Sequence, residues 1–143
     1  FKTQVLFPEG WHFFTRDVRE LQTRVYYKNQ FGEWELEPRM PNVSAFNYFG
    51  ANRAVRAMGV EYALYLYEVA PTDWYAHEGT VSDLLRQADQ VPATEVSSDF
   101  RNSIMCGEYL LLAAEPVPWA WSPTYDRVHM PIKATRLLVN CQL

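Results

Sequence analysis

The sequence predicts a single α+β domain in which an antiparallel β-sheet is packed on one face by two to three helices. Three observations predict this class. The length, 143 residues, is close to the commonest size of one domain, so we expect one domain over residues 1–143. The composition, 48% hydrophobic and 21% charged, is that of a chain that folds around a core. Alternating runs near both ends enclose helical patterns in the middle.

The first half of the chain predicts a hairpin followed by helix. Residues 21–28 (LQTRVYYK) and 33–37 (EWELE) alternate and are separated by a turn signal, so residues 21–37 predict a β-hairpin. Residues 42–59 predict a helix that begins after Ser44 and ends or kinks at Gly59. Residues 60–69 (VEYALYLYEV) fit either a helix or a strand, and their helix formers, with Pro71 as a stop, favour a second helical run.

The second half predicts a short helix and three strands. Thr80 and Asp83 have the spacing of a capping box, which predicts a helix over residues 80–88. After Pro92, strands are predicted at residues 93–98, 107–115 and 132–140.

Composition and motifs argue against several function classes. A net charge of -4, a pI near 5.3 and the lack of a basic run argue against nucleic-acid binding. No apolar run approaches the length of a membrane span. The six glycines form no phosphate-binding or dinucleotide motif, the histidines lack metal-ligand spacing, and no serine elbow occurs. We therefore predict no cofactor and no metal.

Cys106 and Cys141 leave two readings open. In an oxidising compartment they would close a loop of about 36 residues and stabilise the fold by roughly 4 kcal/mol. In a reducing compartment they would be two small apolar residues. The position of Cys141 next to a terminus that would otherwise fray favours the disulfide.

The stretch EPVPWAWSP (115–123) carries two tryptophans behind two prolines. If the chain there is extended, Trp119 and Trp121 lie on the same face. One interpretation is that these indoles cap one end of the core. The other is that the prolines keep the segment out of the sheet and the indoles anchor a protein or membrane interface.

Charged residues offer a second candidate site. Arg53 and Arg56 lie three apart on the expected helix, and Glu61 could reach back toward them around Gly59. The plain interpretation is a solvated, salt-bridged helix face. The functional interpretation is that these arginines hold carboxylates from the loops that carry Asp17 or Glu115.

Three stretches together resemble the signature segments of the SdpA family: FPEGWHFFTRDVRE, GANRAVRAMGVEYAL and CGEYLLLAAEPVPWAW. The members of this family are accessory proteins of bacterial systems that produce sporulation-delaying-protein-type antimicrobial peptides. The resemblance runs from about residue 7 to the end of the chain. Two positions depart from the expected pattern: Met58 stands where we expect Gln, and His12 where we expect a small residue. The matching positions are Trp11, Phe13, Phe14, Thr15, Arg16, Arg19, Glu20, Arg53, Arg56, Gly59, Glu61, Cys106, Gly107, Glu115, Pro116, Pro118, Trp119 and Trp121.

The resemblance implies an accessory protein for the maturation of a secreted peptide toxin. Its expected partners are a polytopic SdpB-like membrane protein and the toxin precursor peptide, and it favours a non-catalytic or co-catalytic subunit. The alternatives are a stand-alone enzyme that acts on the precursor through Cys106 or a Glu/Arg constellation, and an unrelated ligand-binding α+β domain. The residues expected to bind the partner are Trp11, Phe14, Arg16, Arg19, Arg53, Arg56, Glu61, Glu115, Trp119 and Trp121.

The resemblance also bears on location. Family members commonly begin with a hydrophobic N-terminal segment, and this chain begins at Phe1 without a methionine, so we expect a signal or anchor to have been removed. We expect a membrane-associated protein in a bacterium, on the extracytoplasmic face if the cysteines are paired. A peripheral cytoplasmic location is the alternative if they are reduced.

Overall fold

A computed structural model describes residues 17, 19–40, 45–52, 54–118, 120–121, 123 and 128–141. In these ranges six strands form one sheet, and two α-helices and three short 3-10 helices lie around it. The strands are β1 (Gln22–Lys28), β2 (Trp34–Leu36), β3 (Tyr75–His77), β4 (Ala93–Ser98), β5 (Gly107–Ala114) and β6 (Ile132–Cys141). The helices are η3 (Ala45–Gly50), α1 (Ala54–Glu68), η4 (Pro71–Asp73), α2 (Val81–Gln87) and η5 (Ala88–Gln90).

The sheet has the order β2-β1-β5-β6-β3, with β4 also paired to β6. The outer side of β6 is shared: β3 pairs with its first residues and β4 with its last six. The predicted antiparallel arrangement holds for every pair except β4 with β6, which run parallel. The chain reverses once from β4 into β5 and again from β5 into β6, so β6 returns in the direction of β4.

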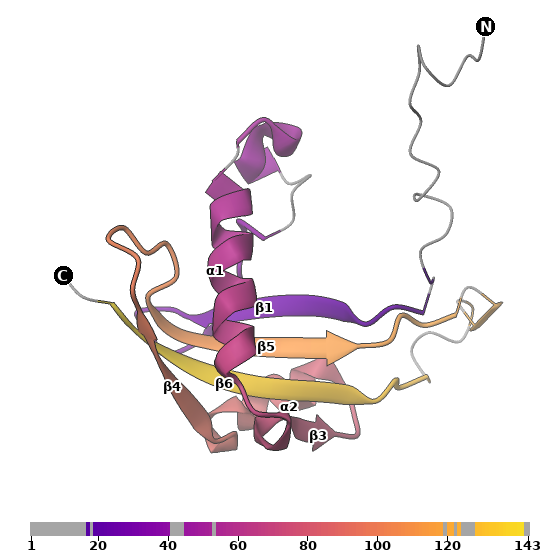
Figure 1. Cartoon of the computed structure of the whole chain (residues 1–143). Helices are drawn as coiled ribbons and strands as arrows, with labels where there is room; N and C mark the ends of the chain where they lie inside the picture. The colour runs from indigo at the N-terminus through magenta and orange to yellow at the C-terminus, as the bar shows by residue number, and fades with distance from the viewer. Residues whose placement is uncertain are drawn as a thin grey trace, which may run out of the picture.

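One face of the sheet is covered by α1. This helix buries Met58 and Tyr65 in a cluster that includes Tyr109 and Leu111 of β5. Figure 1 shows α1 running across β1, β5 and β6 at a steep angle.

The other face is covered by α2. Leu84 packs in a second cluster with Leu110 and Leu112, which alternate along β5 with the residues of the first cluster. Because successive side chains of a strand point to opposite faces, α1 and α2 lie on opposite sides of the sheet. The expectation that the helices share one face is therefore wrong. The sequence reason is the central strand: β5 is buried at every position from Tyr109 to Ala113, as in a strand covered on both faces.

The helical prediction was also wrong in one boundary. A single helix, α1, continues through Gly59, which was expected to end or kink it, and only η3 precedes it in the described part of residues 42–59. Ser44 lies outside the described residues. A glycine inside a helix costs about 1 kcal/mol, and the buried Met58 and Glu61 on either side of it offset that cost.

The remaining elements agree with the sequence analysis. The hairpin forms β1 and β2, and the three later strands lie where they were predicted. The capping box at α2 is present: the Thr80 hydroxyl accepts the Asp83 N–H at 3.1 Å, and the Asp83 carboxylate accepts the Thr80 N–H at 3.3 Å. The three-residue strand β3 was missed because it is too short to show a period. No helix in the described part of the chain has the length and apolar character of a membrane span.

Candidate functional site

The two ends of the sheet differ in how they are closed. The strand register places Gln22, Ala114 and Ile132 side by side at one end, here named the cleft end. The opposite end, where β1 and β6 finish and β5 begins, is named the disulfide end because Cys106 and Cys141 meet there.

A cleft of about 510 Å³ lies at the cleft end, between the first residues of β1, the start of α2 and the chain that connects β5 to β6. Apolar groups from Pro116, Val117 and Met130 contribute to its wall, together with polar groups from Arg24 and Glu115. The full described lining is Gln22, Arg24, Gly79, Thr80, Val81, Ser82, Leu112, Ala114, Glu115, Pro116, Val117, Val128, His129, Met130 and Ile132.

The first three residues of the EPVPWAW stretch, Glu115, Pro116 and Val117, line this cleft. Glu115 is exposed, and Trp121 keeps 50% of its surface in solvent. The Trp121 N–H donates to the Pro118 carbonyl at 2.9 Å, so the chain turns after Pro118 and does not stay extended as predicted. Trp119 lies outside the described residues. The structure therefore has an exposed indole at Trp121. The prediction that two indoles share one face depended on an extended chain, and this hydrogen bond shows a turn instead.

Of the other predicted partner-binding residues, the structure describes Arg19, Arg56 and Glu61. Arg19 is exposed before β1, where its N–H donates to the Asp17 carboxylate at 2.9 Å, and Arg56 is exposed on α1. Trp11, Phe14, Arg16 and Arg53 lie outside the described residues.

Glu61 is the residue whose surroundings differ most from the expectation. It is 5% exposed, and its carboxylate accepts the N–H groups of Ile104 and Met105, each at 3.0 Å. It also accepts the Ser103 hydroxyl at 2.9 Å. Glu61 thus joins the loop between β4 and β5 to α1. Its carboxylate accepts hydrogen bonds inside the fold and does not lie, as was expected, on an exposed surface with the arginines.

The loop that Glu61 holds leads directly into the cysteine pair. The sulfur atoms of Cys106 and Cys141 lie 2.01 Å apart, and their Cα atoms are 5.7 Å apart, which is a disulfide. Tyr65 adds a hydrogen bond of 3.1 Å between its hydroxyl and that of Ser103. Sequence reasoning missed Tyr65 and Ser103, although Tyr65 lies one helical turn after Glu61 and so shares its face.

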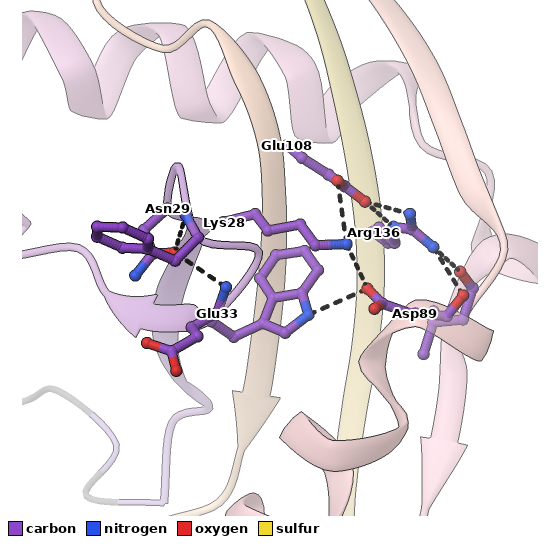
Figure 2. Close-up of polar contacts among 9 residues, drawn as sticks. Lys28, Asn29, Glu33, Asp89, Glu108 and Arg136 are labelled. Carbon is purple, nitrogen blue, oxygen red and sulfur yellow. Dashed lines mark hydrogen bonds and ion pairs between the residues drawn. The ribbon is translucent and has the colours of Figure 1, made fainter.

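An ionic network that the sequence did not reveal also lies near the disulfide end (Figure 2). The Lys28 ammonium is 2.7 Å from the Asp89 carboxylate and 3.5 Å from that of Glu108. The Arg136 guanidinium pairs with Glu108 and donates to the Asp89 carbonyl at 2.8 Å. The hydrogen bond from Lys28 lowers the pKa of the Asp89 carboxyl and raises that of the ammonium. The two positive charges of this network balance its two negative charges. Because the four residues come from β1, β5, β6 and η5, the network joins these elements.

Two neighbouring contacts complete the same region. The Trp34 indole N–H donates to the Asp89 carboxylate at 3.3 Å, and the Lys28 ammonium lies 5.3 Å from the centre of the Trp34 ring. The Asn29 side chain accepts the N–H groups of Phe31 and Glu33, each at 2.9 Å, which closes the hairpin turn seen in Figure 2. Within the described ranges, no group of three or more His, Cys, Asp or Glu residues could hold a metal ion.

Comparison with known proteins relates the chain to one family. The family model described as "Sporulation delaying protein SdpA" matches residues 1–139. The protein named "Uncharacterized protein YitP" of Bacillus subtilis is 24% identical over 136 residues, which are 95% of this chain and 74% of that protein. The "Sporulation-delaying protein SdpA" of the same organism is 23% identical over 135 residues, 91% of this chain and 81% of that protein. No solved structure matches.

Proposed function

Because the chain belongs to the SdpA family, we propose that it is an accessory protein for the maturation of a secreted antimicrobial peptide of the sporulation-delaying type. The observation that carries this proposal is the family match over residues 1–139. In this role the chain acts with a polytopic SdpB-like membrane protein on the toxin precursor peptide.

The disulfide supports an extracytoplasmic location at the membrane. Disulfides persist in oxidising environments and are rare in the cytosol. The Cys106–Cys141 pair is therefore compatible with a chain that works on the outer face of the membrane.

The same disulfide favours a non-catalytic or co-catalytic subunit over a thiol enzyme. A cysteine nucleophile reacts as a free thiolate, and Cys106 in a disulfide has no thiol to ionise. The precursor or the membrane protein would instead dock at the cleft end, where the exposed Glu115 lines a cleft of mixed polarity and the same connecting chain carries the exposed Trp121. Exposed tryptophans are preferred anchors of protein interfaces.

A pull-down tests this function. The tagged chain would be expressed in a bacterium that produces the peptide, recovered from detergent-solubilised membranes, and its partners identified by mass spectrometry. We expect a polytopic membrane protein to co-purify with the wild type, and Trp121→Ala or the double variant Trp119→Ala/Trp121→Ala to lower its yield by about tenfold, the loss typical of an interface anchor.

The matched control is Phe31→Ala. Phe31 is an aromatic residue with 78% of its surface exposed, but it lies in the hairpin turn, away from the cleft. This variant should co-purify like the wild type. Full co-purification by the double tryptophan variant would refute docking at the cleft end, and unchanged toxin secretion after deletion of the gene would refute the accessory role itself.

A further inference from the structure

The floor of the cleft at the cleft end consists of two rows of side chains. The strand register places Gln22, Ala114 and Ile132 in one row, and Arg24 beside Leu112 in the next. Residues paired in register share a face, and Leu112 and Ile132 belong to the cluster that packs against α2. Both rows therefore lie on the face that α2 covers. The small side chain of Ala114, in the central strand, leaves space above this floor, where the cleft of about 510 Å³ lies.

Two cations of β1 lie on this face, and they differ in their partners. Arg24 and Lys28 are an even number of positions apart, so their side chains point to the same side of the strand. Lys28 forms ion pairs with Asp89 and Glu108. The exposed side chain of Arg24 has no ion pair or hydrogen bond in the part of the chain that the structure describes. A guanidinium in the cleft is therefore without a counter-ion there.

A carboxylate lines another part of the same cleft. Glu115 directly follows β5 and is exposed, and its side chain also has no ion pair or hydrogen bond within the described ranges. Arg24 is paired with Leu112, three residues before Glu115, which corresponds to roughly 10 Å of strand. The cleft thus presents a positive and a negative group at separate points, with the apolar Ala114 between them.

These features fit the C-terminal end of a peptide. A guanidinium binds a carboxylate through two parallel hydrogen bonds, so a free main-chain carboxylate is matched to Arg24. An apolar last side chain is matched to the apolar lining at Val81 and Ile132. An extended peptide covers roughly 10 Å in three residues, so a basic residue three positions before the last one reaches Glu115.

We propose that the cleft binds the free C-terminal end of an extended peptide. The terminal carboxylate pairs with Arg24, the apolar last side chain lies over Ala114, and a basic residue three positions earlier pairs with Glu115. A fatty acid has the same carboxylate and an apolar chain, but it would cover the polar side chains of Gln22 and Ser82 without offering them a hydrogen-bond partner. The inference names the substrate class of the cleft and rests on the docking proposed there, with the toxin precursor as the source of such an end.

The experiment uses the purified chain and a defined probe. The probe is a hexapeptide, dye-labelled at its N-terminus, that ends in lysine, serine, alanine and leucine with a free carboxylate, and fluorescence anisotropy measures its binding. The control ligand is the same peptide with an amidated end. We expect saturable binding of the probe and about tenfold weaker binding of the amide, because the amide loses the charge-assisted hydrogen bonds.

Substitutions assign the two charges of the cleft. Arg24→Gln should weaken binding of the free-acid probe about tenfold and that of the amide little, because only the acid has a charge for the guanidinium. Arg24→Lys keeps the charge without the planar fork and should fall between the wild type and Arg24→Gln. Glu115→Gln should weaken both peptides by about threefold, the loss of one exposed ion pair. The matched control is Arg101→Gln, which removes an exposed arginine from the loop between β4 and β5 and should bind like the wild type.

Several outcomes would overturn the proposal. These are the absence of saturable binding, equal binding of acid and amide, wild-type affinity in Arg24→Gln, and an equal loss in Arg101→Gln. Displacement of the probe by dodecanoate at a lower concentration than by the unlabelled peptide would assign the cleft to a fatty acid instead. If Arg24→Gln does not fold, the comparison of acid and amide on the wild type decides the matter. No membrane protein is present in this assay, so failed probe binding beside an intact pull-down would refute this inference alone.

Discussion

The disulfide end and the cleft end of the same sheet differ in how their residues are engaged within the fold. At the disulfide end, a covalent bond joins Cys106 to Cys141, the Glu61 carboxylate holds the adjoining loop, and four charged side chains pair with one another. At the cleft end, the chain leaves the sheet at a proline-rich turn, Trp121 is exposed, and the first half of β1 has one strand partner among the described residues.

This fold concentrates its internal polar contacts at the disulfide end and leaves exposed groups at the cleft end. Polar groups at the disulfide end are satisfied by internal partners, so they stabilise the fold and have little left for a ligand. Glu115 and Trp121 at the cleft end are exposed, so a partner can contact them. Substitutions at the two ends should therefore separate effects on folding from effects on binding.

The largest effect on stability should come from removing the disulfide. The bond closes a loop with a sequence separation of 35 residues, and the double variant Cys106→Ser/Cys141→Ser should lower the free energy of unfolding by about 4 kcal/mol. Urea denaturation followed by circular dichroism measures this change. Under conditions where the variant is folded, its yield of the membrane partner in the pull-down should stay within about twofold of the wild type, a change too small to reflect a lost contact. A parallel loss of both would show that the two ends are coupled.

Removing the buried carboxylate should have the next largest effect. Glu61→Ala leaves the N–H groups of Ile104 and Met105 without their acceptor in a buried place, which should cost about 3 kcal/mol. Glu61→Gln keeps one acceptor oxygen and should cost less. The matched control is Glu68→Ala, which removes an exposed acid from the same helix and should change stability by less than about 0.5 kcal/mol. Equal effects of Glu61→Ala and Glu68→Ala in urea denaturation would contradict the loop-fastening role.

A smaller and pH-dependent effect is expected at α2, whose first residues border the cleft. Thr80→Ala removes the N-cap and should cost about 1 kcal/mol. Hydrogen bonds from Thr80 and from Arg86 lower the pKa of the Asp83 carboxyl from 3.8 to about 2. A lowered folded-state pKa stabilises the fold above the unfolded value, so the contribution of Asp83 should be present above pH 4 and lost as the pH falls from about 4 to about 2.

The control for this pH dependence is another aspartate. Asp83→Asn should flatten the stability profile between about pH 4 and pH 2, because the titrating group is gone. Asp99→Asn removes an exposed acid from the loop after β4 and should leave that part of the profile in place. Thermal unfolding monitored at a series of pH values measures both. A profile that Asp83→Asn leaves unchanged would show that another group titrates there.

The sequence could predict what depends on neighbours along the chain. The hairpin, the capping box of Thr80 and Asp83, and the three later strands follow from alternation and spacing, and all are present. The continuation of α1 through Gly59 and the placement of α2 on the opposite face depend on packing between distant segments, which local patterns do not encode. The sequence signal that both faces are covered was the uninterrupted apolar run of β5, from Tyr109 to Ala114.

The candidate site was also predictable from the sequence only in part. The proline-rich stretch was visible as a motif, and Glu115, Pro116 and Val117 at its start line the cleft. The partners of Glu61, by contrast, come from a loop more than forty residues later in the chain, and the network of Lys28, Asp89, Glu108 and Arg136 combines four elements. Spacing along the sequence carries no information about such meetings, because each charge is consistent with a solvated surface until the fold is known.

Trp121 should affect binding more than stability, and this makes its substitution the sharpest test of the difference between the two ends. Half of its surface is exposed, so truncation removes on the order of 100 Å² of buried apolar area, and Trp121→Ala should lower the free energy of unfolding by about 1–2 kcal/mol, less than Glu61→Ala does. The same variant should lose the membrane partner in the pull-down. Glu61→Ala should retain the partner when the two variants are compared at equal concentrations of folded protein, as measured by circular dichroism. If Trp121→Ala instead destabilises the chain as much as Glu61→Ala does, its indole is part of the core, and the cleft end is closed by packing in the same sense as the disulfide end.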